Sequence, residues 1–279
     1  MNDKKIKPQK SLGQNFLIDK NISAKIVKLS SIDKNCYVLE IGPGLGALTV
    51  PLAQAAGHVL AVELDTRMVS QLRDILAAFE NVTVIQGDIL KLDIMQTVGE
   101  TLKAKNLHVC ANLPYNITTP VITKLIETGL FEAVTVMIQK EVAQRICASP
   151  GTPEYGAFTV FANYHTVPEI LFDVPPECFS PKPKVTSSVI KMQIRKEKRL
   201  SPDDEKLFFR TVRAAFGQRR KTLVNALHSV FESTHSKEDI TKAIEGCGFD
   251  PKIRGERLSI EDFERLSKCL NQIYQQTHF

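Results

Sequence analysis

The sequence predicts an α/β fold with a doubly wound parallel sheet, followed by a small helical domain. From residue 36 to about residue 140, short apolar runs alternate with helical patterns. These runs are apolar along nearly their whole length, as expected for parallel strands that helices cover on both sides. Beyond Arg195 the apolar runs stop and amphipathic helical patterns follow one another. The two patterns place a sheet domain first and a helical domain second.

Five parallel strands are expected, with a helix between each and the next. The strands are Cys36–Ile41, Val59–Leu64, Val82–Gln86, Leu107–Ala111 and Val134–Ile138. The helices are Ala47–Ala56, Thr66–Phe79, Ile89–Ala104 and Thr119–Glu127. A doubly wound sheet of this kind binds its ligands at the carboxyl ends of its strands.

Two later runs, Ala157–Thr166 and Thr186–Ile194, alternate less cleanly and are separated by a proline-rich loop. We expect them to form an antiparallel pair that closes one edge of the sheet. A helix start follows at Ser201-Pro202, because serine caps helices and proline suits the first turn. Three or more helices are then predicted, over Glu205–Phe231, Lys237–Cys247 and Ile260–Tyr274. The expected domains are therefore residues 1–198 and 199–279.

The net charge of +5 is unevenly distributed along the 279 residues. Residues 1–35 carry eight Lys and Arg against three Asp and Glu, and residues 195–279 carry seventeen against thirteen. Residues 36–194 carry eleven against fifteen. Basic ends around an acidic middle favour a polyanionic partner that the ends bind. The alternative is that these lysines and arginines only solvate a surface.

The composition also limits where the protein can reside and which metal or disulfide chemistry it can use. No window is long and apolar enough to span a membrane, and residues 1–9 lack the apolar region of a secretory signal. The six cysteines form no Cys-x-x-Cys pair, which favours free thiols in a reducing compartment. The histidines have no ligand spacing. We therefore expect a cytoplasmic protein with no membrane partner and no metal.

The expected strand ends carry the residues of a cofactor site. Gly42-Pro43-Gly44-Leu45-Gly46 follows the first strand, and its Gly-x-Gly-x-Gly spacing differs from that of dinucleotide binders. Glycines there let the backbone pass close to a ligand. Glu63 ends the second strand and could accept both ribose hydroxyls, and Asp88 after the third could accept from an adenine amino group. The set favours S-adenosylmethionine, with NAD as the alternative.

The fourth strand leads into Asn112-Leu113-Pro114-Tyr115, a turn suited to methylating the exocyclic amino group of a base. The lone pair of that nitrogen is delocalised, and an amide oxygen with a neighbouring carbonyl can localise it by accepting its two N–H groups. Pro114 fixes the backbone and biases Leu113 away from a helix. Tyr115 offers a flat face for the base. The alternative is an ordinary strand-to-helix turn.

With these residues, the chain resembles the ribosomal RNA adenine N6-dimethyltransferases, most closely the bacterial enzymes of the small subunit. The resemblance covers nearly the whole length. It rests on Lys10–Leu17, Gly42–Gly46, Glu63, Gly87-Asp88, Asn112–Tyr115, Gln139–Ala143, Tyr155-Gly156, Phe179–Val185 and Arg213–Lys221. It implies a Rossmann-like methyltransferase sheet, S-adenosylmethionine as cofactor and direct methyl transfer.

The resemblance also implies roles for individual residues. We expect three residues to fold over the cofactor, Gln14, Asn15 and Leu17. The composition of this N-terminal segment alone would indicate a disordered leader. The expected cofactor contacts are Gly42, Gly44, Glu63, Leu64, Asp88, Ile89 and Asn112. Phe179 is expected to line the pocket of the target adenine opposite Tyr115, with a core position as its alternative.

RNA contacts are expected from the helical domain, at Arg213, Arg219, Arg220 and Lys221, where Phe209 and Phe216 are interleaved. The alternative is an amphipathic helix with solvated arginines. By resemblance, the target is two adjacent adenosines in a hairpin loop near the 3′ end of small-subunit (16S) ribosomal RNA. We expect a monomer that acts on the immature small subunit during ribosome biogenesis.

Three other functions are weighed against this one. A resistance-type methyltransferase of large-subunit RNA commonly has Ile in place of Leu113 and usually lacks the Leu-Gly before Gln14. A non-catalytic assembly factor would not need the intact glycine loop, Glu63, Asp88 and the Asn112–Tyr115 turn. A small-molecule or protein methyltransferase is disfavoured by the basic ends.

Overall fold

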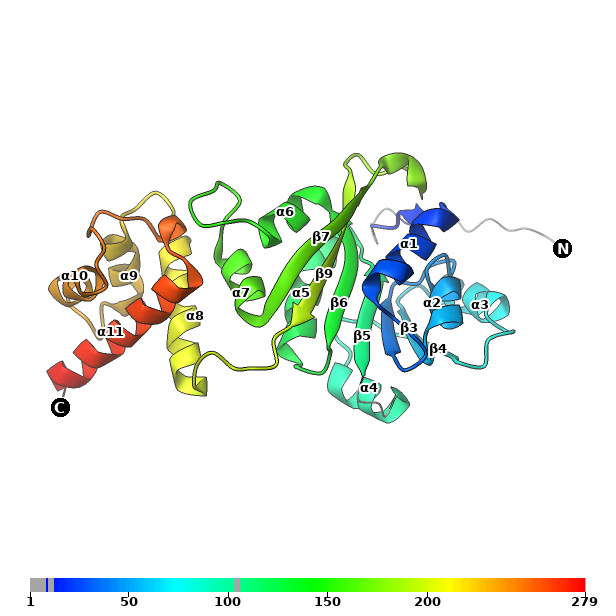
Figure 1. Ribbon diagram of the computed structural model, residues 1–279, viewed down its shortest axis with the longest axis horizontal. Helices are drawn as coiled ribbons and strands as arrows, with labels where there is room; N and C mark the ends of the chain where they lie inside the picture. The colour runs from blue at the N-terminus through cyan, green and yellow to red at the C-terminus, as the bar shows by residue number, and fades with distance from the viewer. Residues whose placement is uncertain (1–8, 10–12, 103–105, 279) are drawn as a thin grey trace. The chain divides into compact units, whose positions relative to one another are not determined.

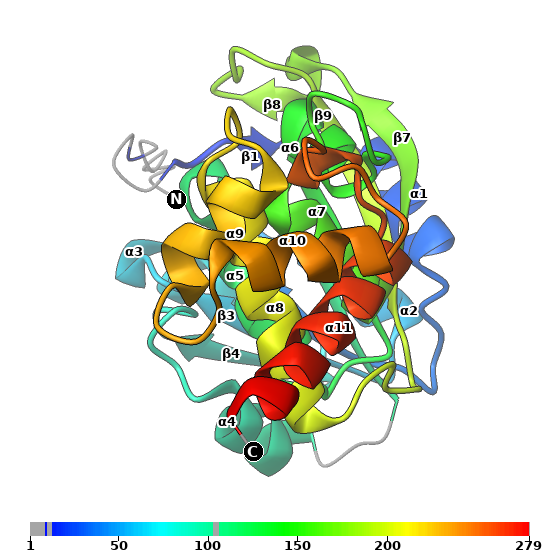
Figure 2. The same cartoon turned by 90° about the vertical axis from the view of Figure 1, so that its left-hand side faces the viewer.

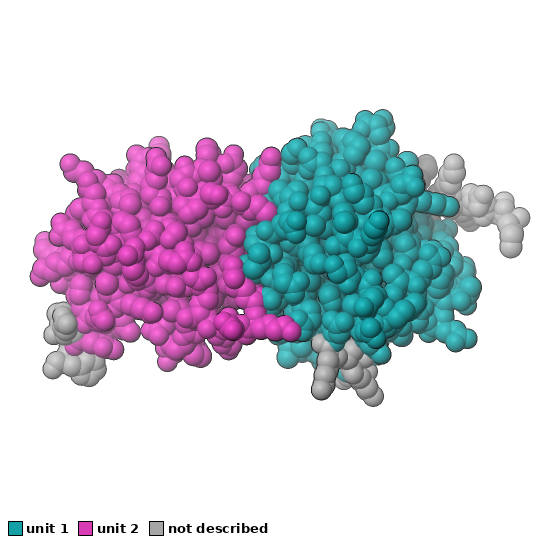
Figure 3. All heavy atoms as spheres, in the orientation of Figure 1, with its two compact units in different colours: residues 1–143, 166–194 teal, residues 144–165, 195–279 magenta. Residues whose placement is uncertain are grey.

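The computed structural model describes residues 9, 13–102 and 106–278 (Figure 1). The chain divides into two compact units, residues 1–143 with 166–194 and residues 144–165 with 195–279 (Figure 3). Most of the basic leader, with Lys10 of the expected family motif, and the end of the predicted helix Ile89–Ala104 lie outside the described residues. The sequence-based boundary after residue 198 differs from this division in the placement of residues 144–165.

The first unit contains a seven-stranded sheet with the order β4-β3-β2-β5-β6-β9-β7 (Figure 1). Its strands are β2 (Tyr37–Ile41), β3 (His58–Glu63), β4 (Val82–Gln86), β5 (Leu107–Asn112), β6 (Ala133–Gln139), β7 (Thr166–Val174) and β9 (Ser187–Ile194). Strands β2 to β6 pair in parallel, and β9 runs antiparallel to both β6 and β7. The five predicted parallel strands are confirmed, with bounds that differ by one residue at most.

These strands are apolar because both faces of the sheet are covered. Val38, Val59 and Val134 are completely or almost completely buried. Helices α1 (Lys20–Ser30) and α2 (Thr49–Ala55) pack against β2 and β3 through such residues. Burying one aliphatic side chain of this size contributes about 1.5–3 kcal/mol, which explains why the strands tolerate so few polar residues.

The remaining helices of this unit follow their strands. They are α3 (Thr66–Ile75), α4 (Ile94–Leu102) and α5 (Thr118–Glu127), and the boundary between the units falls inside α6 (Lys140–Ile146). Helix α3 begins after Asp65, whose side chain accepts a hydrogen bond from the Arg67 amide and so caps the helix. Helix α1 is capped in the same way by Asp19 and was not predicted.

The predicted strand Ala157–Thr166 is wrong. Residues Ala157–His165 form helix α7 in the second unit, and the strand that pairs with β9 is β7, which begins at Thr166. Val160 and Tyr164, one helical turn apart, are buried in the core of the second unit. This packing overrides the strand propensity of the β-branched and aromatic residues. The predicted antiparallel strand over Thr186–Ile194 is confirmed as β9.

The second unit is helical. Helix α8 (Pro202–Gly217) packs against α9 (Leu223–Phe231) and α11 (Ile260–His278), and α10 (Lys237–Gly246) packs against α9 and α11 (Figure 2). Ser201 caps α8 and Pro202 occupies its first turn, as predicted. The single helix predicted over Glu205–Phe231 is wrong, because the chain leaves the helix after Gly217 and restarts at Leu223.

Two short strands join distant parts of the first unit. Strand β1 (Phe16–Leu17) pairs antiparallel with β8 (Phe179–Ser180), and the Ile18 amide donates to the Cys178 carbonyl at 2.9 Å. The leader is thereby fixed to the loop before β9. Within the described part of the chain, no helix has both the length and the apolar character of a membrane span.

Candidate active site

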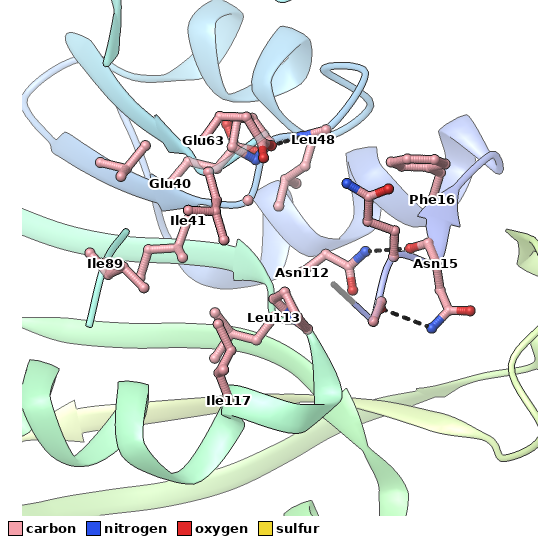
Figure 4. A pocket seen from close by; sticks show the side chains of 18 of the residues that line it. Asn15, Phe16, Glu40, Ile41, Leu48, Glu63, Ile89, Asn112, Leu113 and Ile117 are labelled. Atoms are coloured by element: carbon pink, nitrogen blue, oxygen red, sulfur yellow. Dashed lines mark hydrogen bonds between the residues drawn. The ribbon is translucent and has the colours of Figure 1, made fainter. Parts of the chain in front are cut away.

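A pocket opens at the carboxyl ends of β2, β3 and β5 (Figure 4). Strand β2 lies between β3 and β5, so the chain order reverses at this point of the sheet, where doubly wound folds bind ligands. The predicted cofactor residues that line the pocket are Gln14, Asn15, Leu17, Gly42, Gly44, Glu63, Leu64, Asp88, Ile89 and Asn112. Leu113, Pro114 and Tyr115 line the same pocket. Of the residues predicted for the cofactor and the chemistry, only Phe179 is not among its lining.

The glycine loop adopts a backbone that other residues avoid. Gly42, Gly44 and Gly46 all have positive φ, at 65°, 57° and 78°. A Cβ atom on Gly44 would lie 3.1 Å from the ring of Phe16, which belongs to β1. The loop therefore combines a left-handed turn with close contact to the leader.

Glu63 is held by the backbone on either side of it. Its Oε2 accepts a hydrogen bond of 3.0 Å from the Gly44 amide, and its Oε1 accepts one of 2.8 Å from the Asp65 amide. Burial raises the pKa of Glu63, while these two donors oppose the shift. Each carboxylate oxygen has a second lone pair, so the ribose hydroxyls predicted for Glu63 can still be accepted.

Asp65 joins the leader to the second strand end. Arg67 contacts both of its carboxylate oxygens, at 2.9 Å and 2.6 Å, and the Gln14 side-chain amide donates to Oδ2 at 3.2 Å. The Arg67 guanidinium is the main cause of a lowered Asp65 pKa of about 2. The sequence analysis did not select Asp65 for the site, although its position before Thr66 is a recognisable helix cap.

Asp88 and Ile89 follow the third strand, and Leu64 follows the second. Asp88 accepts a hydrogen bond of 3.0 Å from the Leu90 amide, which turns the chain away from β4. Leu64 is about half exposed at 48%, whereas Ile89 is buried. A carboxylate and aliphatic side chains that line the same pocket suit the edge and the faces of an adenine ring.

Asn112 is oriented by the leader. Its Nδ2 donates to the backbone carbonyl of Asn15 at 3.2 Å, a contact that Figure 4 shows as a dashed line. Among the described residues, no donor meets the Asn112 Oδ1. The Leu113 amide donates to the Met137 carbonyl at 3.1 Å, and no described residue donates to the Leu113 carbonyl. Two oxygens are thus left to accept from a ligand.

Phe179 lies in the hydrophobic core, which is the alternative position that the sequence analysis weighed for it. Its side chain is 2% exposed and belongs to the core that contains Leu17, Met137 and Val189. Pairing with Leu17 across the β1–β8 ladder holds it there. The ring is therefore packed in this core, and Phe179 is not among the residues that line the pocket.

Glu40 lines the pocket and was not selected from the sequence. It is 1% exposed, and its Oε2 has no hydrogen-bond partner among the described residues. Burial raises the pKa of Glu40 to about 8, and the nearby Glu63 carboxylate adds to the shift. The available signal was an acid inside an otherwise apolar strand, where an uncompensated charge is costly.

The four cations predicted for RNA belong to the second unit. Arg213 is exposed on α8, and Arg220 and Lys221 are exposed in the turn before α9. Arg219 donates to the carbonyls of Pro153, at 3.2 Å, and of Tyr155. Arg219 therefore also has a structural contact, which the sequence did not reveal.

The residues present fit S-adenosylmethionine. The unpartnered, buried Oε2 of Glu40 beside the bare backbone of the glycine loop suits a nucleoside that carries an amino-acid tail. The adjoining carboxylates at Glu63 and Asp88 suit its ribose and its adenine. The fold and this site define a Rossmann-like methyltransferase that uses S-adenosylmethionine.

Comparison with known proteins defines the family. The model of the family described as "Ribosomal RNA adenine dimethylase" matches residues 5–272. The chain is 47% identical to ribosomal RNA small subunit methyltransferase A of Shouchella clausii (strain KSM-K16), over 94% of this chain and 89% of that relative. It is 46% identical to the protein of the same name from Streptococcus pneumoniae (strain ATCC BAA-255 / R6), over 94% of this chain and 91% of that one.

Two solved structures resemble the whole chain. A dimethyladenosine transferase from Plasmodium falciparum matches with a TM-score of 0.80 at 28% identity, over 92% of this chain and 98% of that one. The 23S rRNA methyltransferase ErmE matches with a TM-score of 0.72 at 25% identity, over 92% of this chain and 100% of that one. The chain belongs to the ribosomal RNA adenine dimethylase family. It is an S-adenosylmethionine-dependent RNA adenine dimethyltransferase.

Proposed function

We propose that the protein dimethylates N6 of two adjacent adenosines in a hairpin loop near the 3′ end of small-subunit (16S) ribosomal RNA. It acts as a monomer on the immature small subunit in the cytoplasm. The observation that carries the chemistry is that Asn112 and Leu113 line the pocket beside Tyr115, and that no described residue donates to the Asn112 Oδ1 or the Leu113 carbonyl. The names of the Shouchella and Streptococcus relatives support the choice of the small subunit.

The two oxygens prepare the target nitrogen. Asn112 Oδ1 accepts one N–H of the adenine amine, and the Leu113 carbonyl accepts the other. The nitrogen lone pair is then directed away from the ring and toward the sulfonium methyl group, the electrophile that S-adenosylmethionine supplies when bound. The Tyr115 ring stacks on the target base, and its face and nearby carbonyl oxygens stabilise the positive charge that develops on nitrogen.

The transfer needs no dedicated base. Bound S-adenosylmethionine would supply the methyl group and would keep the electron pair of the broken methyl–sulfur bond, while the adenine nitrogen supplies the electron pair of the new N–C bond. The methylated ammonium is acidic and releases a proton to water. A second round on the same nitrogen gives the dimethylated product. We accordingly assign no catalytic histidine or aspartate.

Each group of site residues has a proposed role. Gln14, Asn15 and Leu17 close over the cofactor, and Glu63 and Asp88 hold its ribose and its adenine. Gly42, Gly44, Leu64 and Ile89 shape the remaining walls. Arg213, Arg219, Arg220 and Lys221 bind RNA phosphates, and the five N–H groups of the Arg219 guanidinium allow it to keep its backbone contacts as well.

The test is to incubate the purified protein with radiolabelled S-adenosylmethionine and unmethylated small ribosomal subunits. The RNA is then digested and the labelled nucleoside is identified. We expect N6,N6-dimethyladenosine in small-subunit RNA. Label in large-subunit RNA instead would support the second candidate, a methyltransferase like ErmE, whose structure is similar over 92% of this chain. Binding without label would support a non-catalytic assembly factor.

A further inference from the structure

The hydroxyl of Tyr115 is fixed by a residue far away in the sequence. It shares a hydrogen bond of 2.7 Å with the Oγ of Ser187, the first residue of β9. Ser187 is completely buried, and it pairs with Gln139 of β6 on one side and Val174 of β7 on the other. Because two strands hold Ser187, its hydroxyl is a fixed point in the sheet.

The other end of the tyrosine is fixed as well. Pro114 precedes it with φ of −57°, and the Ile117 amide donates to the Pro114 carbonyl at 3.2 Å, which closes the short helix η2 (Tyr115–Ile117). Burial raises the pKa of Tyr115, so its hydroxyl stays protonated and keeps the bond near neutral pH. The ring is thus anchored at both ends while its face lines the pocket.

We propose that Ser187 is a positioning residue for methyl transfer, which holds the Tyr115 ring as a preformed platform for the target adenine. The proposal rests on the proposed function, in which Tyr115 stacks on that base. A ring that is already ordered loses no freedom when the base arrives, and it keeps the amine aligned with Asn112 Oδ1 and the Leu113 carbonyl. Ser187 acts through Tyr115 and does not itself touch the base.

The chain provides a matched control in the next residue. Successive side chains of a strand point to opposite faces. Accordingly, the Ser188 hydroxyl donates to Asp173 Oδ1 at 2.6 Å, and Asp173 in turn pairs with Lys140. Ser188→Ala therefore removes a buried hydroxyl from the same strand without touching Tyr115.

The experiment is a double-mutant cycle in the full-length protein with unmethylated small subunits as substrate. Ser187→Ala and Tyr115→Phe each remove one partner of a neutral hydrogen bond, so each should lower kcat about five-fold. The double variant should be no slower than the slower single variant, because both changes remove one interaction. KM for S-adenosylmethionine should stay unchanged, and Ser188→Ala should keep the wild-type kcat.

The competing outcomes are distinct. Multiplying losses in the double variant, or equal losses in Ser187→Ala and Ser188→Ala, would overturn the positioning role. The stoichiometry of S-adenosylmethionine binding corrects every kcat for misfolded protein. If Ser187→Ala does not fold, Tyr115→Phe removes the same bond without altering β9, and a wild-type kcat for Tyr115→Phe would overturn the role.

One further variant separates this inference from the proposed function. If Tyr115→Ala keeps its activity, the stacking role of Tyr115 in the proposed function fails. If Tyr115→Ala is inactive while Ser187→Ala and Tyr115→Phe are both fully active, only the inference about Ser187 fails.

Discussion

At the scale of single residues, Asn112 connects the leader to the chemistry. Its Nδ2 donates to the Asn15 carbonyl, and in the proposed function its Oδ1 accepts from the target amine. Asn112→Ala should lower kcat by about two orders of magnitude or more, since an oriented polar group in a catalytic site contributes on that scale. RNA binding, measured by filter retention, should be nearly unchanged. Equal losses of binding and transfer would contradict the assigned role.

Asn112→Asp tests the orientation separately from the acceptor. The aspartate keeps an oxygen toward the amine but places a second oxygen against the Asn15 carbonyl, which repels it. We expect a kcat between those of the wild type and Asn112→Ala, and a weaker contact between residue 112 and the Asn15 carbonyl. Limited proteolysis near Gln14 is the readout, and Asn106→Asp serves as a control because Asn106 contacts Asn35 and Cys36 outside the pocket.

Glu40 gives stability a measurable pH dependence. Its pKa rises from 4.5 to about 8 on folding, mainly through burial, with Glu63 adding to the shift. The folded state therefore binds the proton more tightly than the unfolded state, so this contribution is complete below pH 4.5 and is lost as pH rises through 8. Thermal unfolding of the cofactor-free protein should shift down across that range, and by less in Glu40→Gln. Identical pH profiles for the two proteins would contradict this prediction.

At the scale of elements, strand β8 tests the two positions considered for Phe179. Because its ring is buried beside Leu17 and Met137, Phe179→Leu should lower the free energy of unfolding by about 1 kcal/mol, the usual cost of an apolar swap in a core. The kcat of the folded fraction should change little. A kcat that drops more than ten-fold with an unchanged unfolding midpoint would instead place the ring against the base.

The helices and strands show which parts of the fold can be predicted from the sequence. The five parallel strands were predictable because each is a short apolar run flanked by glycine or a polar turn, a pattern that depends on local residues alone. Four of them are largely buried, and the edge strand β4 is partly buried. Helix α7 was not, because its strand-like composition is overruled by packing of Val160 and Tyr164 in the other unit. The break after Gly217 was missed for a related reason, since Gln218–Lys221 has good helix propensity.

The residues of the candidate site also differ in how well the sequence alone predicts them. Residues at strand ends could be found because topology alone brings strand ends together. Ser187 could not, because its contact with Tyr115 joins residues distant in the chain. Glu40 and Asp65 had local signals, an acid in an apolar strand and a helix cap, but their burial and the Gln14 contact depend on distant residues. The core position of Phe179 follows from its ladder with β1, which composition does not reveal.

At the scale of the whole molecule, the two units differ in the charge that each presents to its proposed ligand. Exposed cations gather before α9 in the second unit, whereas the cofactor pocket of the first unit contains carboxylates. Replacing Arg220 and Lys221 together with alanine should weaken RNA binding and reduce the slope of log K against log salt by about 1.4–1.8, or 0.7–0.9 for each lost phosphate contact. The paired change Lys237→Ala with Lys242→Ala, on α10, removes the same charge as a control. An unchanged slope would exclude this turn from the phosphate interface.

The pairing of β1 with β8 has a consequence for synthesis of the chain. Leu17 leaves the ribosome long before its partner Phe179, which is added only after the whole parallel sheet has been translated. Until then the glycine loop exists without its cover, and the Asn112 amide has no anchored carbonyl to meet. A nascent chain of this protein therefore contains the complete set of cofactor residues well before it can close a site around them.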